Sequence, residues 1–177
     1  LEEDLLPYLI KKKLVVGKTF QNFFLDIGSP KYFNKSASLL KKYFKRRAAF
    51  LDRDGVINVD NNYVHKVSDF IFTDYIFDLC RAAKQKDYKI IVITNQAGIG
   101  RGLYSESDFV DLTRWMIDIF ISQEIVIEKV YFCPFHKEHG IGHYRQDSYD
   151  RKPNPGMIIK ALNKFGISAN ESVLVGD

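Results

Sequence analysis

The stretch that decides the fold is residues 50–58, FLDRDGVIN, in which two aspartates, Asp52 and Asp54, follow a short apolar run. A carboxylate at the end of a buried strand is costly to desolvate unless a cation or hydrogen bonds compensate it. Gly55 lets the chain turn, so we expect Asp54 to return over the same space as Asp52. The pair indicates a strand end that binds a cation or carries chemistry.

Outward from this stretch, apolar runs of strand length alternate with helical patterns. We expect strands at 48–52, 88–94, 129–133 and 172–176 and helices at about 75–86, 105–122 and 155–165. Ser105 with Asp108 forms a capping-box pattern, and Pro155 suits a first helical position. The alternation predicts an α/β fold, a Rossmann-like parallel sheet covered by helices on both faces.

Polar residues follow the predicted strands, where open parallel sheets bind their ligands. Thr94 and Asn95 follow the second strand, Cys133 the third and Asp177 the fourth. Three polar strand ends stabilise a sheet poorly but suit the lining of a site. We therefore predict a functional site at this edge of the sheet.

The residue types at this edge suit phosphoryl transfer. Asp52 is the predicted nucleophile or metal ligand, and Asp54 protonates the leaving oxygen and then activates water. Thr94 offers a hydroxyl, and Lys152, in a loop that opens a helix, brings a fixed positive charge. Because carboxylate oxygens suit Mg²⁺, Asp177 is expected to complete its binding site.

Composition and charge argue against a membrane-spanning protein and against a nucleic-acid-binding protein. The chain has 177 residues and 46% hydrophobic residues, which is typical of a globular domain, and no apolar run is long enough for a membrane span. Residues 48–177 hold 15 Lys and Arg against 18 Asp and Glu, a net charge of −3. We therefore expect no nucleic-acid partner. The two cysteines suggest no disulfide framework and favour the cytoplasm.

Several strings resemble the haloacid dehalogenase-like phosphatases, above all heptose 1,7-bisphosphate phosphatases and, next to them, histidinol-phosphate phosphatases. They are FLDRDGVIN, VITNQAGIGRG, DRKPNPGM and VLVGD. The resemblance implies Asp52 as nucleophile, Asp54 as acid and base, Thr94 and Lys152 stabilising the phosphoryl group, and Mg²⁺ on Asp52, Asp177 and the Asp54 carbonyl. The residues expected to bind a sugar phosphate are Asp60, Tyr63, Asn95, Gln96 and Arg151.

The resemblance departs from the family in one loop, where relatives hold zinc with a Cys-x-His pair and a Cys-x-Cys pair. This chain has Cys133 with Phe135, and Ser148 with Asp150, so one ligand of four remains. Zinc sites need four well-placed ligands, so we expect no zinc, although the loop histidines His136, His139 and His143 leave another Cys/His site open. Packing through Tyr144 and Tyr149 is expected to hold the loop instead.

The first part of the chain, residues 1–46, differs from residues 47–177. TFQNFFLDIGSP reads as a strand-like segment with a turn, followed by a helix that begins at Pro30 and is capped by Ser29. The segment is similar to the C-terminal end of sugar-1-phosphate nucleotidyltransferases, where Asp26 matches an acidic turn residue. A simple N-terminal extension is the alternative interpretation.

The phosphatase part is expected to be incomplete at its C-terminus, which leaves the last strand as an edge open to self-association. The leading hypothesis is a heptose bisphosphate phosphatase, fused to a nucleotidyltransferase. Histidinol-phosphate phosphatase is one alternative. A non-catalytic module that binds phosphate or acts as a scaffold is another.

Overall fold

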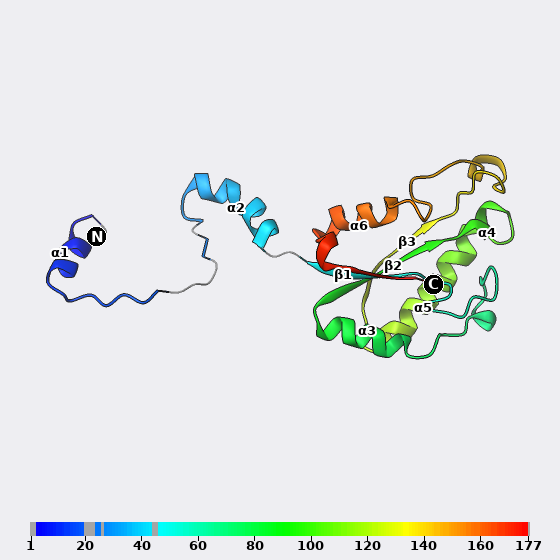
Figure 1. Cartoon of the computed structure of the whole chain (residues 1–177), viewed down its shortest axis with the longest axis horizontal. Helices are drawn as coiled ribbons and strands as arrows, with labels where there is room; N and C mark the ends of the chain where they lie inside the picture. The colour runs from blue at the N-terminus through cyan, green and yellow to red at the C-terminus, as the bar shows by residue number, and fades with distance from the viewer. Residues whose placement is uncertain (1–2, 20–23, 26, 44–45, 177) are drawn as a thin grey trace. The chain divides into compact units, whose positions relative to one another are not determined.

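The computed structural model describes residues 3–19, 24–25, 27–43 and 46–176. The chain forms two compact units, Leu1–Tyr43 and Phe44–Asp177 (Figure 1). Each unit is described by itself. The predicted site residues belong to the second unit, except that Asp177 lies outside the described residues.

The second unit contains a four-stranded parallel sheet in the order β3-β2-β1-β4. The strands are β1 (Arg47–Leu51), β2 (Tyr88–Asn95), β3 (Ile127–Cys133) and β4 (Val173–Val175). The helices are α3 (Ile76–Gln85), α4 (Ala97–Gly100), α5 (Glu106–Ser122) and α6 (Gly156–Phe165), with 3-10 turns η1 (Val67–Asp69), η2 (Gly142–Tyr144) and η3 (Ala169–Glu171). Because all strands run the same way, their carboxyl ends lie along one edge of the sheet.

Helices cover both faces of this sheet, with α6 on one side and α3 and α5 on the other (Figure 1). Successive residues of β1 point to opposite faces: Ala48 and Phe50 pack in the cluster that contains α6, and Ala49 and Leu51 in the cluster that contains α3 and α5. Burial on both faces explains why β1 and β2, the two central strands, read as continuous apolar runs rather than as alternating ones.

The predicted elements of this unit are confirmed, with ends displaced by at most two residues. Helix α5 begins after Ser105, whose side chain forms the expected capping box with Asp108. Pro155 is the residue before the first helical residue of α6 rather than the first one. The short helix α4, directly after β2, was not predicted from the sequence.

The first unit contains two helices, α1 (Leu5–Lys11) and α2 (Pro30–Tyr43). The predicted start at Pro30 is confirmed, but the predicted side-chain cap is wrong, because the first helical bonds reach the Ser29 carbonyl and its hydroxyl has no partner among the described residues. The described residues of this unit form no strand, and residues 20–23 and 26, part of the predicted extended segment, lie outside them.

Strand β4 forms one edge of the sheet, and Val173 and Leu174 on it are exposed. The predicted edge is confirmed, whereas self-association stays a prediction. Cys80 and Cys133 are free thiols, as expected, and both are buried. Among the helices that the structure describes, none has the length and apolar character to cross a membrane.

Candidate active site

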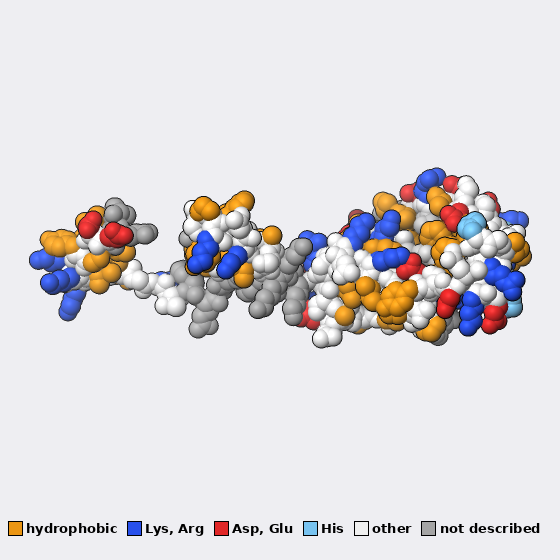
Figure 2. All heavy atoms as spheres, turned by 90° about the horizontal axis from the view of Figure 1, so that it is seen from above, with side chains coloured by type: hydrophobic (Ala, Val, Ile, Leu, Met, Phe, Trp, Pro, Cys, Tyr) orange, Lys and Arg blue, Asp and Glu red, His pale blue; other side chains and the backbone are white. Residues whose placement is uncertain are grey.

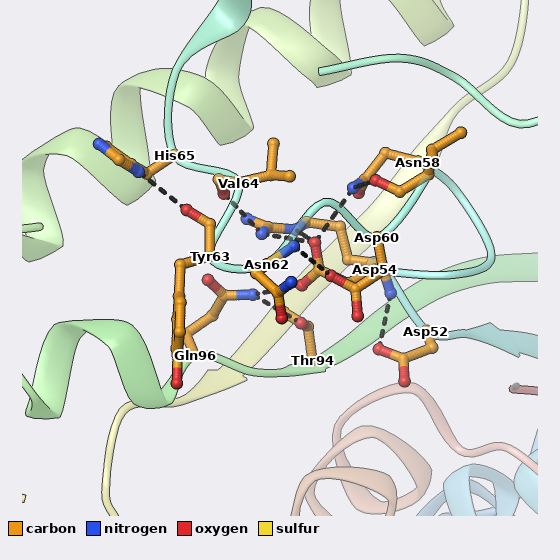
Figure 3. Close-up of polar contacts among 12 residues, drawn as sticks. Asp52, Asp54, Asn58, Asp60, Asn62, Tyr63, Val64, His65, Thr94 and Gln96 are labelled. Carbon is orange, nitrogen blue, oxygen red and sulfur yellow. Dashed lines mark hydrogen bonds and ion pairs between the residues drawn. The ribbon is translucent and has the colours of Figure 1, made fainter. Parts of the chain in front are cut away.

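The site begins where β1 ends, at Asp52. The Asp52 backbone N–H donates to the Val175 carbonyl of β4 at 3.0 Å, so the hydrogen-bond ladder between β1 and β4 fixes the backbone of this residue. Its carboxylate is 15% exposed and stands at the carboxyl edge of the sheet (Figure 3). The predicted position of Asp52 at a strand end is therefore confirmed.

Asp52 forms an ion pair with Lys152, which lies in the loop before α6. Its other carboxylate oxygen, Oδ1, accepts a hydrogen bond from the Arg53 backbone N–H at 2.7 Å. Burial raises the pKa of Asp52 above its ordinary value, and the contact with Lys152 partly offsets this increase. The structure thus brings together two of the predicted catalytic residues that are far apart in the sequence.

The carboxylate of Asp54 turns away from Asp52 and into a network of donors (Figure 3). Gly55 allows the turn, because its φ of 82° lies in the left-handed region. Asp54 Oδ1 accepts from the Arg53 guanidinium at 2.7 Å and from Asn58 Nδ2 at 3.1 Å, and Oδ2 accepts from Gln96 Nε2 at 3.1 Å. Both oxygens of the predicted acid and base are therefore held by protein donors.

Arg53 is a member of this network that sequence reasoning missed. It is 1% exposed, and its guanidinium also donates to the Val64 carbonyl at 2.8 Å. A buried guanidinium requires a carboxylate and carbonyl oxygens around it. The aspartates on either side of Arg53 in the sequence were the available signal. Arg53 connects Asp54 to the loop that contains the predicted substrate residues.

Thr94 and Gln96 lie beside Asp54 at the end of β2, and each is 1% exposed (Figure 3). Gln96 Nε2 donates to Thr94 Oγ1 at 2.8 Å, and Gln96 Oε1 accepts from the Tyr104 hydroxyl at 2.6 Å. The polar atoms of the Gln96 side chain thus all have partners inside the protein. The substrate-binding role of Gln96 stays a prediction, because these contacts occupy its NH₂ group but leave Oε1 able to accept a second hydrogen bond.

Asn95 also has partners within the protein. Its Nδ2 donates to the Lys152 carbonyl at 3.2 Å, and its Oδ1 accepts from the Lys152 N–H at 3.0 Å. This reciprocal pair attaches the lysine loop to the end of β2. Asn95 thus supports the backbone of Lys152, whereas the substrate contact expected from the sequence stays a prediction.

The remaining predicted substrate residues have local contacts. Arg151 donates to the Phe135 carbonyl at 3.2 Å, and Asp60 accepts from the Asn62 N–H at 3.0 Å. The ring of Tyr63 is partly exposed, and the guanidinium of Arg101 lies 5.7 Å from its centroid. The described contacts do not join these residues to Asp52, so their role in binding stays a prediction.

A metal ion would find oxygen donors at this edge. Asp52 supplies a carboxylate with limited exposure, and carboxylate oxygens suit Mg²⁺ better than softer metals. Within residues 3–19, 24–25, 27–43 and 46–176, no three acidic, His or Cys side chains cluster as a metal site. The expected third acid, Asp177, lies outside those ranges. The carboxylate of Asp52 fits Mg²⁺ in donor type.

The loop between β3 and α6 is held by packing in part. Tyr144 packs against the cluster of Ile99, and its hydroxyl donates to Glu106 at 2.9 Å. The predicted support by Tyr144 is confirmed, whereas Tyr149 is 62% exposed and does not provide it. His136 Nδ1 accepts the backbone N–H groups of Glu138 and His139. The predicted lack of zinc stays a prediction.

Comparison with known proteins gives the following relatives. The profile of the polynucleotide kinase 3 phosphatase family matches residues 48–177. A D-glycero-alpha-D-manno-heptose-1,7-bisphosphate 7-phosphatase of Burkholderia mallei is 56% identical over 133 residues, which cover 75% of this chain and 70% of the relative.

Two solved structures are similar. A protein from Mesorhizobium loti described as a HAD-like phosphatase is 30% identical, with a TM-score of 0.71 over 75% of this chain. The chain spans 64% of the length of that protein, slightly less than two thirds. The D,D-heptose 1,7-bisphosphate phosphatase of B. bronchiseptica, complexed with magnesium and phosphate, is 24% identical, with a TM-score of 0.66 over 74% of this chain and 70% of its own. At that identity the match concerns the fold alone.

Proposed function

Because the chain belongs to the polynucleotide kinase 3 phosphatase family, within the haloacid dehalogenase-like phosphatases, we propose that it hydrolyses a sugar phosphate monoester. The proposed reaction is removal of the 7-phosphate from D-glycero-D-manno-heptose 1,7-bisphosphate, in the synthesis of activated heptose for surface polysaccharide. The single observation that carries the proposal is the Asp52–Lys152 ion pair at the carboxyl edge of the sheet. A carboxylate nucleophile at a strand end, beside an ammonium that compensates phosphoryl charge, is the arrangement that this reaction needs.

In the proposed first step, a carboxylate oxygen of Asp52 attacks phosphorus. The bond between phosphorus and the sugar oxygen breaks, the sugar leaves as an alcohol, and an aspartyl-phosphate forms. The ammonium of Lys152 compensates the negative charge on the phosphoryl oxygens. Mg²⁺, which we assign to Asp52, the Asp54 carbonyl and Asp177, would supply further charge compensation when bound.

Asp54 is the proposed acid and base. It donates a proton to the leaving sugar oxygen and then accepts one from the water that attacks the aspartyl-phosphate and releases phosphate. In this structure its carboxylate is bound to Arg53, Asn58 and Gln96. These donors define the orientation from which Asp54 must act on the leaving group.

Charge supports a small substrate over a polynucleotide, although the family is named for a phosphatase that acts on polynucleotides. Residues 48–177 carry a net charge of −3, from 15 Lys and Arg against 18 Asp and Glu, whereas a protein that binds a phosphate backbone presents a basic surface. Two free, buried thiols are consistent with the cytoplasm, where we place the protein. For residues 1–46 we retain the proposal of a nucleotidyltransferase-derived segment.

The test compares the rates of phosphate release from both anomers of heptose 1,7-bisphosphate and from histidinol phosphate. We expect the heptose substrate to be preferred, Mg²⁺ to be required, and Asp52→Asn to lower the rate by at least about 1,000-fold. Undiminished turnover by Asp52→Asn would contradict the mechanism. Preference for histidinol phosphate would replace the proposed substrate and leave the chemistry in place.

A further inference from the structure

A chain of buried hydrogen bonds leads from Tyr104 to Thr94. Tyr104 is 8% exposed, and Gln96 and Thr94 are each 1% exposed. The distances are 2.6 Å from the Tyr104 hydroxyl to Gln96 Oε1 and 2.8 Å from Gln96 Nε2 to Thr94 Oγ1.

The direction of each hydrogen bond follows from chemistry. An amide oxygen and a carboxylate oxygen both only accept, so the contact with Asp54 Oδ2 fixes the NH₂ end of the Gln96 amide, and the Tyr104 hydroxyl donates to the oxygen at the other end. Burial raises the pKa of Tyr104 to about 12, which keeps the hydroxyl protonated. The Gln96 NH₂ group must then supply its two hydrogens to Thr94 Oγ1 and to Asp54 Oδ2, which is 3.1 Å away.

Thr94 is the last residue in this series of hydrogen bonds. Because its oxygen accepts a hydrogen bond from Gln96, its own hydrogen must point in another direction. Among the described residues, the structure records no acceptor for that hydrogen. A phosphoryl oxygen at the carboxyl edge of the sheet is an acceptor of the right chemistry.

We propose that Gln96 and Tyr104 are positioning residues, which orient the Thr94 hydroxyl so that it donates to an oxygen of the transferred phosphoryl group. The inference rests on the proposed function. If the amide were free to flip, Gln96 Oε1 would face Thr94 and accept its hydrogen, and the donor would be lost to the substrate. Asp54 Oδ2, which only accepts, opposes this flip, and the hydrogen bond from the Tyr104 hydroxyl holds Gln96 Oε1 on the opposite side.

Tyr104→Phe tests the hydroxyl apart from packing. The ring stacks on His65 at 4.9 Å and lies so close to Gly98 that an added Cβ there would be 2.2 Å from it, and phenylalanine retains both contacts. In the full chain we expect kcat to fall about 10-fold with KM changed less than about two-fold, and Gln96→Leu to lower kcat about 100-fold. Tyr144→Phe, which removes another tyrosine hydrogen bond, to Glu106, is the matched control and should keep full activity.

A double-mutant cycle separates positioning from a structural effect. In a Thr94→Val background, Tyr104→Phe should lower kcat by less than about two-fold, because the hydroxyl that it orients is gone. The same 10-fold loss in both backgrounds would overturn the inference, as would full activity of Tyr104→Phe.

Binding of orthovanadate with Mg²⁺, measured by calorimetry, gives a readout that does not depend on turnover. We expect Tyr104→Phe and Thr94→Val to weaken vanadate binding to a similar extent, about 5- to 10-fold, with unchanged thermal unfolding of Tyr104→Phe. Equal vanadate affinity in wild type and Tyr104→Phe would refute the positioning role. An inactive wild type that still binds vanadate in this pattern would count against the proposed function alone.

Discussion

The two units of the chain contrast in how they are built. Helix α1 of the first unit has no buried residue, and its hydrophobic side chains Leu5, Leu6, Tyr8 and Ile10 are exposed beside basic ones (Figure 2). The second unit buries both faces of its sheet and contains polar side chains such as Arg53, Asn58 and Gln96 at 1% exposure or less. A helix can therefore form from short-range signals alone, whereas the site requires contacts between distant segments.

The largest expected difference between the units is the loss of unfolding free energy when a hydrophobic side chain is truncated. Phe120 is fully buried in the second unit, with the rings of Phe77 and Phe72 at 5.2 and 5.8 Å. Phe120→Ala should lower the free energy of unfolding by about 3–5 kcal/mol, because it leaves a cavity. Leu5→Ala, at 46% exposure in the first unit, should change it by less than about 0.5 kcal/mol. Urea unfolding measures both, and equal losses would remove the contrast.

The next largest expected effect is on catalysis, and it distinguishes two lysines of the second unit. Lys152→Met should lower kcat about 100-fold, because the phosphoryl charge loses its cation. Lys160→Met breaks another lysine–aspartate pair, to Asp150, but that lysine is 58% exposed and no predicted step uses it. Phosphate release should therefore be unchanged by Lys160→Met. A comparable loss in both variants would show that general charge, rather than the place of Lys152, supports the reaction.

Two serines of helices in the two units should differ less in their effect on stability. Ser105 caps α5 through its side chain, and Ser105→Ala should destabilise the second unit by about 1 kcal/mol. Ser36, in α2, donates to the Phe33 carbonyl within its own helix, so Ser36→Ala should change stability by less than about 0.5 kcal/mol. Thermal unfolding of the two variants checks the pair. A larger effect from Ser36 would mean that the first unit depends on side-chain contacts after all.

The smallest effect is the pH dependence from Asp52, because burial and Lys152 act on it in opposite directions. Its pKa is raised in the folded state, so the stability that it contributes is full below the unfolded pKa and is lost as pH rises through the folded pKa. The difference in melting temperature between Asp52→Asn and wild type should therefore move in favour of the variant as pH rises above the ordinary pKa of an aspartate. A difference that moves the other way would contradict the raised pKa.

Local patterns predicted the fold of the second unit well, since strand alternation and capping are short-range signals. They also placed Asp52 and Lys152 together, because strand ends and helix starts meet at one edge of a parallel sheet. The hydrogen-bond partners of Gln96, Asn95 and Arg53 could not be predicted from the sequence. Whether an amide faces a ligand or the protein depends on side chains tens of residues away, and the sequence does not encode that choice locally.

The hydrogen bond from the Asp52 amide to the Val175 carbonyl also links catalysis to the order in which the chain is assembled. During synthesis, β1 is complete long before β4 leaves the ribosome, so the backbone of the proposed nucleophile first lacks its final support. We therefore expect the centre to be complete only when the last described strand docks. Amide hydrogen exchange at Asp52 would report that docking, and its protection should appear together with activity.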